Sequence, residues 1–166
     1  MTEHPEIDFS GLEPDDRDLL ETWLAFAQAH VSTVDALDRR LEAAHHLPVA
    51  WFEVLARLSH APGGGLRMLE LADQLLLSRS GVTRLMDRLE AAGLIRREVY
   101  LSDRRGTVAL LTDRGWDVFQ RATPDFLAML RERFGRHLPA EEVTALRAAL
   151  VRLARPLTTD DRRPKA

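Results

Sequence analysis

Arginines and hydroxyl side chains are interleaved in one short stretch of the sequence, "SRSGVTRLMDRLE", at residues 78–90. Arginine donates two hydrogen bonds at once to guanine or phosphate, and serine and threonine hydroxyls also donate to phosphate oxygens. The polar donors of the stretch are Ser78, Arg79, Ser80, Thr83, Arg84 and Arg88. Residues of these types at this spacing indicate contact with duplex DNA.

The stretch is basic although the chain as a whole is acidic, with a formal net charge of −3 over 166 residues. Residues 1–21 hold eight acids against one arginine, whereas residues 78–106 hold seven arginines against four acids. The local field steers a polyanion, so the total charge does not exclude a nucleic acid partner. An arginine-bearing face alone is more often solvated surface than a DNA-binding site. The elements that position the arginines decide between these two interpretations.

Apolar residues behind the arginines recur at the helical spacing i, i+3, i+4 and i+7: they are Val82, Leu85, Met86 and Leu89. This spacing predicts a helix with Ser78 as its N-cap and Gly93 at its C-terminal end. A short helix over residues 66–77 precedes it, with Leu69 and Ala72 on its apolar face. The runs 94–101 and 107–112 flank "SDRRG" and predict a β-hairpin.

Longer helices flank this segment. Apolar spacing predicts one helix from Asp15 to about residue 44 and another from Pro48, which the glycines of "APGGG" end. Beyond Thr112, an expected N-cap, a further helix kinks or splits at Pro124, and a last helix covers residues 140–154. The terminal helices carry more apolar surface than so small a domain covers, which indicates a partner subunit.

We therefore expect a mainly α fold with a small β-hairpin wing: a winged helix-turn-helix whose N- and C-terminal helices form a dimerisation region. The expected parts are a flexible acidic tail (1–14), the helical dimerisation region (15–47 and 113–156), the DNA-binding lobe (48–112) and a second flexible tail (157–166).

In a helix-turn-helix, the second helix lies in the DNA major groove with its N-terminal residues against the base edges. We expect Ser78 and Ser80 to contact phosphates. Arg79, Thr83 and Arg84 then reach base edges, and Arg88 contacts phosphate or another side chain.

The hairpin tip carries three further charged residues. Arg104 and Arg105 can enter the minor groove, where the negative potential is concentrated. Asp103 would repel phosphate, so its expected role is an ion pair that orients one of these arginines.

From about residue 71 to residue 112 the sequence resembles the MarR family of bacterial winged-helix regulators, through "ELADQLLLSRSGVTRLMDRLEAAGLIRR" and "SDRRGTVALLTDRG". The order of helices over residues 15–156 fits the same family. The resemblance implies a homodimer joined by its terminal helices, with DNA contacts at the residues named above. The sequence departs from the family at Leu76, where a glycine is frequent, and at residues 99–101 of the wing.

The resemblance also implies a small aromatic or phenolic effector bound between the dimer helices and the DNA-reading lobe. Aromatic candidates for its site are Trp23, Trp51, Phe52 and Trp116, and His30 and Arg57 could pair with an anionic group. Aromatic residues at helical spacing are more often part of the core, which is the competing reading.

Other classes of protein find little support. The chain has no cysteine, no run of the ~18 apolar residues that a membrane span needs, and an acidic N-terminus unlike a signal peptide. Adjacent histidines at 45 and 46 point to different sides of a helix, so we expect no metal and no cofactor. No nucleophile–base pair or phosphate loop indicates an enzyme.

The sequence thus predicts a cytoplasmic, bacterial, homodimeric DNA-binding regulator. Its expected mode of action is repression at a pseudo-palindromic operator, released by a small molecule. A transcriptional activator of the same fold remains an alternative. So does a winged-helix module whose arginine face binds an acidic protein.

Overall fold

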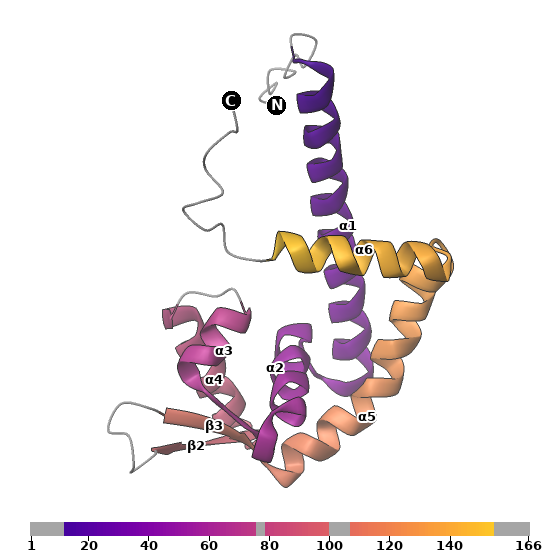
Figure 1. The fold of residues 1–166 in the computed structure, drawn as a ribbon. Helices are drawn as coiled ribbons and strands as arrows, with labels where there is room; N and C mark the ends of the chain where they lie inside the picture. Colours follow the sequence, from indigo (N-terminus) through magenta and orange to yellow (C-terminus); the bar gives the residue numbers. More distant parts are fainter. Residues whose placement is uncertain (1–11, 76–78, 100–106, 155–166) are drawn as a thin grey trace, which may run out of the picture. The chain divides into compact units, whose positions relative to one another are not determined.

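The computed structural model describes residues 12–75, 79–99 and 107–154, and these fall into two compact units that divide between Thr123 and Pro124 (Figure 1). The elements that begin in the first unit are α1 (Pro14–His45), α2 (Val49–His60), η1 (Pro62–Gly64), β1 (Gly65–Arg67), α3 (Met68–Leu75), α4 (Arg79–Ala91), β2 (Ile95–Val99), β3 (Thr107–Leu111) and α5 (Asp113–Leu130). The second unit holds the end of α5, the π-helical turn η2 (Arg131–Gly135) and α6 (Ala140–Leu153). The predicted winged helix-turn-helix order is confirmed.

A three-stranded antiparallel sheet has the order β1-β3-β2, with β1 before the helix pair α3 and α4 in the chain and β2 and β3 after it. The predicted hairpin is β2 with β3, paired from Ile95 opposite Leu111 to Val99 opposite Thr107. Strand β1 was not expected: Gly65 pairs with Leu110 and Arg67 with Val108, in residues assigned from the sequence to the glycine break and the start of a helix. The central strand is therefore β3, and β1 and β2 are its two neighbours.

The apolar face of α4 packs into the core of the first unit, as its spacing predicts. Val82, Met86 and Leu89 are at most 1% exposed, and Leu85 is half-buried. On α3 the expected burial of Leu69 is wrong, because its side chain is 57% exposed and Leu71 is buried instead. The buried side of α3 holds Leu71 and Ala72, with Leu75 partly buried one turn beyond Leu71, and Leu69 lies on the exposed side of the helix.

The N-terminus of α2 is capped by a side chain of α1, which joins the two helices. Pro48 stands at the N-cap of α2 and provides no side-chain bond, but the Asp38 carboxylate on α1 accepts a hydrogen bond from the Val49 N–H at 2.8 Å. His46 ends α1 in the left-handed conformation, at φ 50°. Near this joint, Leu37 and Leu41 are buried.

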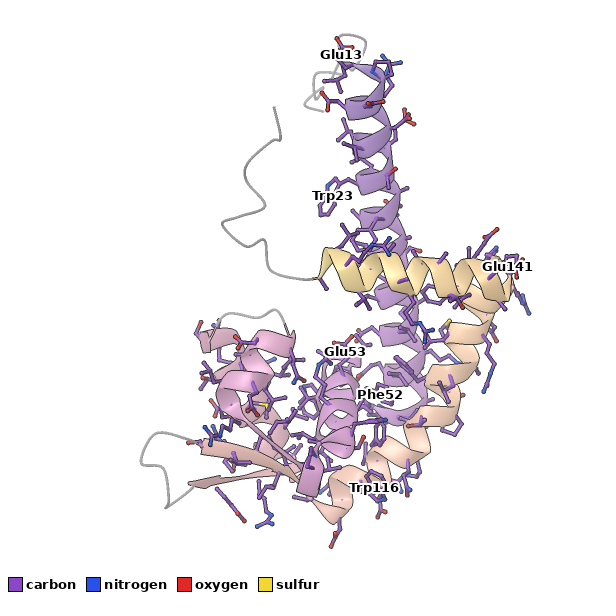
Figure 2. The ribbon with its side chains drawn as sticks, viewed as in Figure 1. Glu13, Trp23, Phe52, Glu53, Trp116 and Glu141 are labelled. Carbon is purple, nitrogen blue, oxygen red and sulfur yellow. The ribbon has the colours of Figure 1, made fainter. Side chains whose placement is uncertain are left out.

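The N-terminal half of α1 exposes large apolar side chains. Trp23 is 61% exposed and projects from the side of the helix (Figure 2). Its exposed apolar neighbours are Leu19, Leu24, Phe26 and Val31. Single exposed apolar residues are normal on a protein surface, but this many on one helix are more than such scattered residues explain.

Helix α5 begins at the expected cap. The Thr112 hydroxyl accepts a hydrogen bond from the Gly115 N–H at 3.0 Å. The helix then continues through Pro124 to Leu130, so of the two predicted outcomes a split at this proline is wrong. In the second unit no described residue of α6 is buried, and Val151 and Leu153 are 55% and 77% exposed. Within the described ranges, no helix is both long and apolar enough to cross a membrane.

Candidate nucleic-acid interface

Helix α4 separates its side chains by chemistry. Its apolar face is buried, and its opposite face exposes Ser80, Thr83, Arg84, Asp87 and Arg88. Arg79 is the first residue of the helix, and Ser78 lies outside the described residues. The structure thus brings four of the six predicted donors of this segment onto one solvent-facing side of one helix.

The acidic residues of α4 are paired with an arginine from the neighbouring strand. Arg97 on β2 donates from Nε to Glu90 Oε2 at 2.8 Å, and its Nη2 also contacts that carboxylate. The same Nη2 lies 2.8 Å from Asp87 Oδ1. In addition, the backbone N–H of Arg97 donates to Glu90 Oε1 at 3.0 Å. We call these three residues the Arg97 clamp.

The clamp favours the ionised forms of Glu90 and Arg97. The side-chain hydrogen bond from Arg97 lowers the pKa of Glu90, helped by the bond from the Arg97 backbone and by the guanidinium charge and opposed by partial burial. The bond to Glu90 in turn raises the pKa of Arg97, with Asp87 adding to the effect. The negative charges of the two carboxylates on α4 are therefore balanced by an arginine from β2, which the sequence of the helix itself does not include.

The clamp leaves the helix arginines available. The side chains of Arg84 and Arg88 have no ion-pair or hydrogen-bond partner among the residues that the structure describes. Because Asp87 and Glu90 are held by Arg97, the field on the exposed face of α4 is set by these two arginines.

Residues Asp103, Arg104 and Arg105 at the expected wing tip lie outside the described residues. The strands on either side are placed: Val99 at the end of β2 pairs with Thr107 at the start of β3. On the face of β2 opposite the clamp, Arg96 and Glu98 form an exposed ion pair with each other.

The predicted effector residues lie in different environments. On α1, Trp23 and His30 both neighbour Phe26, with ring centroids 6.0 and 6.4 Å from it. Phe52 is 3% exposed and its ring packs 5.3 Å from that of Phe119, while Trp51 is half-buried. Figure 2 shows Phe52 on α2 and Trp116 on the first turns of α5.

Arg57 is bonded to two backbone carbonyls, and its Nη1 lies 3.6 Å from the Glu53 carboxylate. Its Nη1 donates to Glu53 O at 3.0 Å and its Nη2 donates to Gln74 O at 3.3 Å, which links α2 to the end of α3. Beside it is an open hollow of about 470 Å³, lined by Ala56, Arg57, His60, Ala61, Pro62, Leu66 and Gln74.

The residues that sequence reasoning missed are those of the clamp. The sequence indicates no role for Asp87 or Arg97 beyond their place in the basic segment at residues 78–106. The available signal was an acid in the last turn of the helix, followed by the short "AAGL" turn and an arginine on a strand. In the part of the chain that the structure describes, no cluster of histidine and acidic residues could hold a metal ion.

Comparison with known proteins identifies similar chains. A MarR family model matches residues 45–106. The chain is 30% identical over 129 residues to the HTH-type transcriptional regulator PecS of Dickeya dadantii, which covers 75% of this chain and 76% of PecS. It is 28% identical over 113 residues to the HTH-type transcriptional regulator MhqR of Bacillus subtilis, across 68% of this chain and 76% of MhqR.

Among solved structures, the fold is similar to that of Sco3205, a MarR family transcriptional regulator from Streptomyces coelicolor in complex with DNA. The TM-score is 0.78 at 29% identity, over 92% of this chain and 91% of Sco3205. All three of these similar proteins are transcriptional regulators, and one of them was solved on DNA.

Proposed function

This chain belongs to the MarR family of DNA-binding transcriptional regulators, and we propose that it reads its operator with the exposed face of α4. The observation that carries the proposal is the distribution of side chains around α4. Its apolar residues are buried, its acids are paired with Arg97, and Arg84 and Arg88 face solvent. A helix sorted in this way offers the donors that base edges and phosphates accept.

Within this proposal each donor has a role set by its place on the helix. Arg79, Thr83 and Arg84 belong to the first turns, which approach base edges when the second helix of a helix-turn-helix enters the major groove. Ser78 and Ser80 contact phosphates, and Arg88, one turn beyond Arg84, contacts the DNA backbone. Asp103, Arg104 and Arg105 form the minor-groove contact of the wing.

The active form in this proposal is a homodimer. The exposed Trp23 and its apolar neighbours on α1 support a second copy as the partner, since a copy would cover surface that is costly to leave in water. A two-fold dimer presents two copies of α4, so the operator is a pseudo-palindrome with half-sites about one helical turn (~10 bp) apart.

The sign of regulation in this proposal is repression. A dimer bound over two turns of promoter DNA in the cytoplasm excludes polymerase from that DNA. A small aromatic or phenolic effector would release the dimer from DNA if it favours a conformation in which the two copies of α4 no longer fit the two half-sites. Transcription in vitro from the selected operator, with and without the protein, distinguishes a repressor from an activator. All three similar proteins are transcriptional regulators, which supports a regulatory rather than a catalytic role.

Selection from a randomised duplex library tests the reading of DNA. The purified protein is mixed with the library, bound DNA is amplified over several rounds, and the winning sequence is titrated against salt. We expect an enriched inverted repeat, with an affinity that falls at a log–log slope of roughly −0.9 per phosphate contact. If no sequence is enriched, the proposal is wrong, and the arginine face of α4 would fit an acidic protein partner instead.

A further inference from the structure

The Arg97 clamp joins the two elements that meet DNA in the proposed function. Asp87 and Glu90 lie on α4, and Arg97 lies on β2, the strand that leads into the wing. Arg97 reaches the helix through Nε, Nη2 and its backbone N–H, so the strand itself is tied to Glu90. Its side chain is 28% exposed, which places these bonds at the edge of the interface between helix and strand.

We propose that Arg97 is a positioning residue for DNA reading: it holds Asp87 on the side of α4 that faces β2, and so keeps Arg84 available to the DNA. The inference rests on the proposed function of α4. Its starting point is a matter of spacing, because Asp87 follows Arg84 by three residues. Side chains three residues apart on a helix are neighbours, and an acid and an arginine there form an ion pair readily.

The structure shows which partner Asp87 takes. Its Oδ1 lies 2.8 Å from Arg97 Nη2, and Arg84 has no ion pair among the described residues. Without Arg97, two carboxylates three residues apart would repel each other and would both seek a cation on α4. Arg84 is the neighbour of Asp87 at the right spacing, and pairing would draw its guanidinium away from the base edges.

The positioning role of Arg97 predicts that a second substitution restores DNA binding, which would not happen if the first substitution simply disrupted the structure. In R97Q, Asp87 loses its partner, and we expect affinity for the selected operator to fall by about tenfold at moderate salt. Adding D87N to R97Q removes the competing acid, so the double variant should recover most of that loss. R97K should fall between R97Q and the original protein, because lysine keeps the charge but lacks the fork that bonds both carboxylates.

R96Q is the matched control. It makes the same change in charge, on the same strand, one residue away, but Arg96 pairs with Glu98 on the opposite face of β2. We expect it to reduce affinity much less than R97Q, since it leaves the bonds to α4 in place. Thermal unfolding of every variant, followed by circular dichroism, shows whether each one is folded at the temperature of the binding assay.

A second readout follows Arg84 directly in the full-length protein without DNA. In ¹⁵N-labelled protein, the Arg84 Nε–H should exchange rapidly with water, and R97Q should slow that exchange as Asp87 pairs with Arg84. R97K serves this measurement if R97Q does not fold. An R97Q variant that folds and binds as tightly as the original protein overturns the inference, and so does a loss that D87N fails to rescue.

R84A separates this inference from the proposed function. If R84A binds the operator as well as the original protein, α4 does not read DNA through Arg84 and both ideas are wrong. If R84A is impaired while R97Q is not, only the positioning role of Arg97 is wrong.

Discussion

Thr112 joins the start of α5 to the end of α4, because its hydroxyl lies 2.8 Å from the Gly93 carbonyl oxygen. The same hydroxyl is 3.0 Å from Leu94 O and accepts from the Gly115 N–H at 3.0 Å. Gly93 has a φ of +69°, which glycine adopts without strain, and the turn it forms directs the chain from α4 into β2. One side chain therefore caps one helix and fixes the turn that ends another.

Replacing Thr112 with valine should destabilise the fold. The variant loses the N-cap bond of α5 and leaves a turn carbonyl without its donor, for an expected loss of about 1–3 kcal/mol in the free energy of unfolding. Urea denaturation followed by circular dichroism measures this loss. T112S restores the hydroxyl and should recover most of it; a T112V protein as stable as the original would show that these bonds contribute little.

Gly115 tolerates no side chain, for a steric reason. A Cβ added there would collide with the Leu94 backbone carbonyl, which is held by Thr112 and cannot easily move. We expect G115A to cost about 1–3 kcal/mol of unfolding free energy, as overpacking does. Gly135 is the control, because a Cβ there meets nothing within 4 Å; G135A should be neutral or slightly stabilising in the same urea titration.

The helices and their buried faces could be predicted largely from sequence, because spacing alone determines the apolar side of α4. Strand β1 could not, since three residues after a glycine run carry no alternation and become a strand only by pairing with β3. The exposure of Leu69 was missed because apolar residues occur on both sides of this short helix, so their spacing fits more than one buried face.

The candidate site divides in the same way. Arg84 and Arg88 were predicted on the exposed face because the helical repeat places them there. The role of Arg97 was not predicted, because its bonds to Asp87 and Glu90 depend on how β2 folds back onto α4 after the turn at Gly93. Which side chains share a face of one helix can be predicted from their spacing in the sequence, whereas contacts between different elements depend on the tertiary fold.

Stability should fall in acid partly through Glu90. Arg97 lowers the pKa of this carboxyl in the folded protein, so its contribution is present above the unfolded-state pKa and is lost as pH falls through the lower folded value. E90Q lacks this contribution, and the gap between the two proteins should close between about pH 5 and pH 3. The groups are partly exposed, so the gap at neutral pH should be under about 1 kcal/mol. Thermal unfolding across this range measures it, and a gap that widens in acid contradicts the assignment.

Arg84 and Arg88 should differ in what their loss does to DNA binding. If Arg84 reads a base, R84A should cost about 1–3 kcal/mol on the selected operator and flatten the preference at one position. R88A should weaken all sequences alike and reduce the salt slope by about 1. Titration of the operator and of single-base variants, at two salt concentrations, separates the cases. Equal weakening on every sequence by R84A would make Arg84 a backbone contact.

Trp23 should be needed for the homodimer. W23E places a charge in the apolar surface of α1, where a partner copy would have to bury it, and should shift the protein toward monomer in analytical ultracentrifugation. L69E is the control, since Leu69 is similarly exposed but lies on α3. A W23E protein that sediments as a dimer at low micromolar concentration would show that this part of α1 is not the interface.

The ion pair between Arg96 and Glu98 has a consequence for how the hairpin behaves at high concentration. Strand β2 pairs with β3 on one side, and no described strand pairs with its other side. An outer strand of this kind is a template on which a strand from another molecule can add, and charged side chains discourage such addition. We therefore expect the pair to discourage strand addition at this edge, on the face of β2 opposite the one that carries Arg97 to α4.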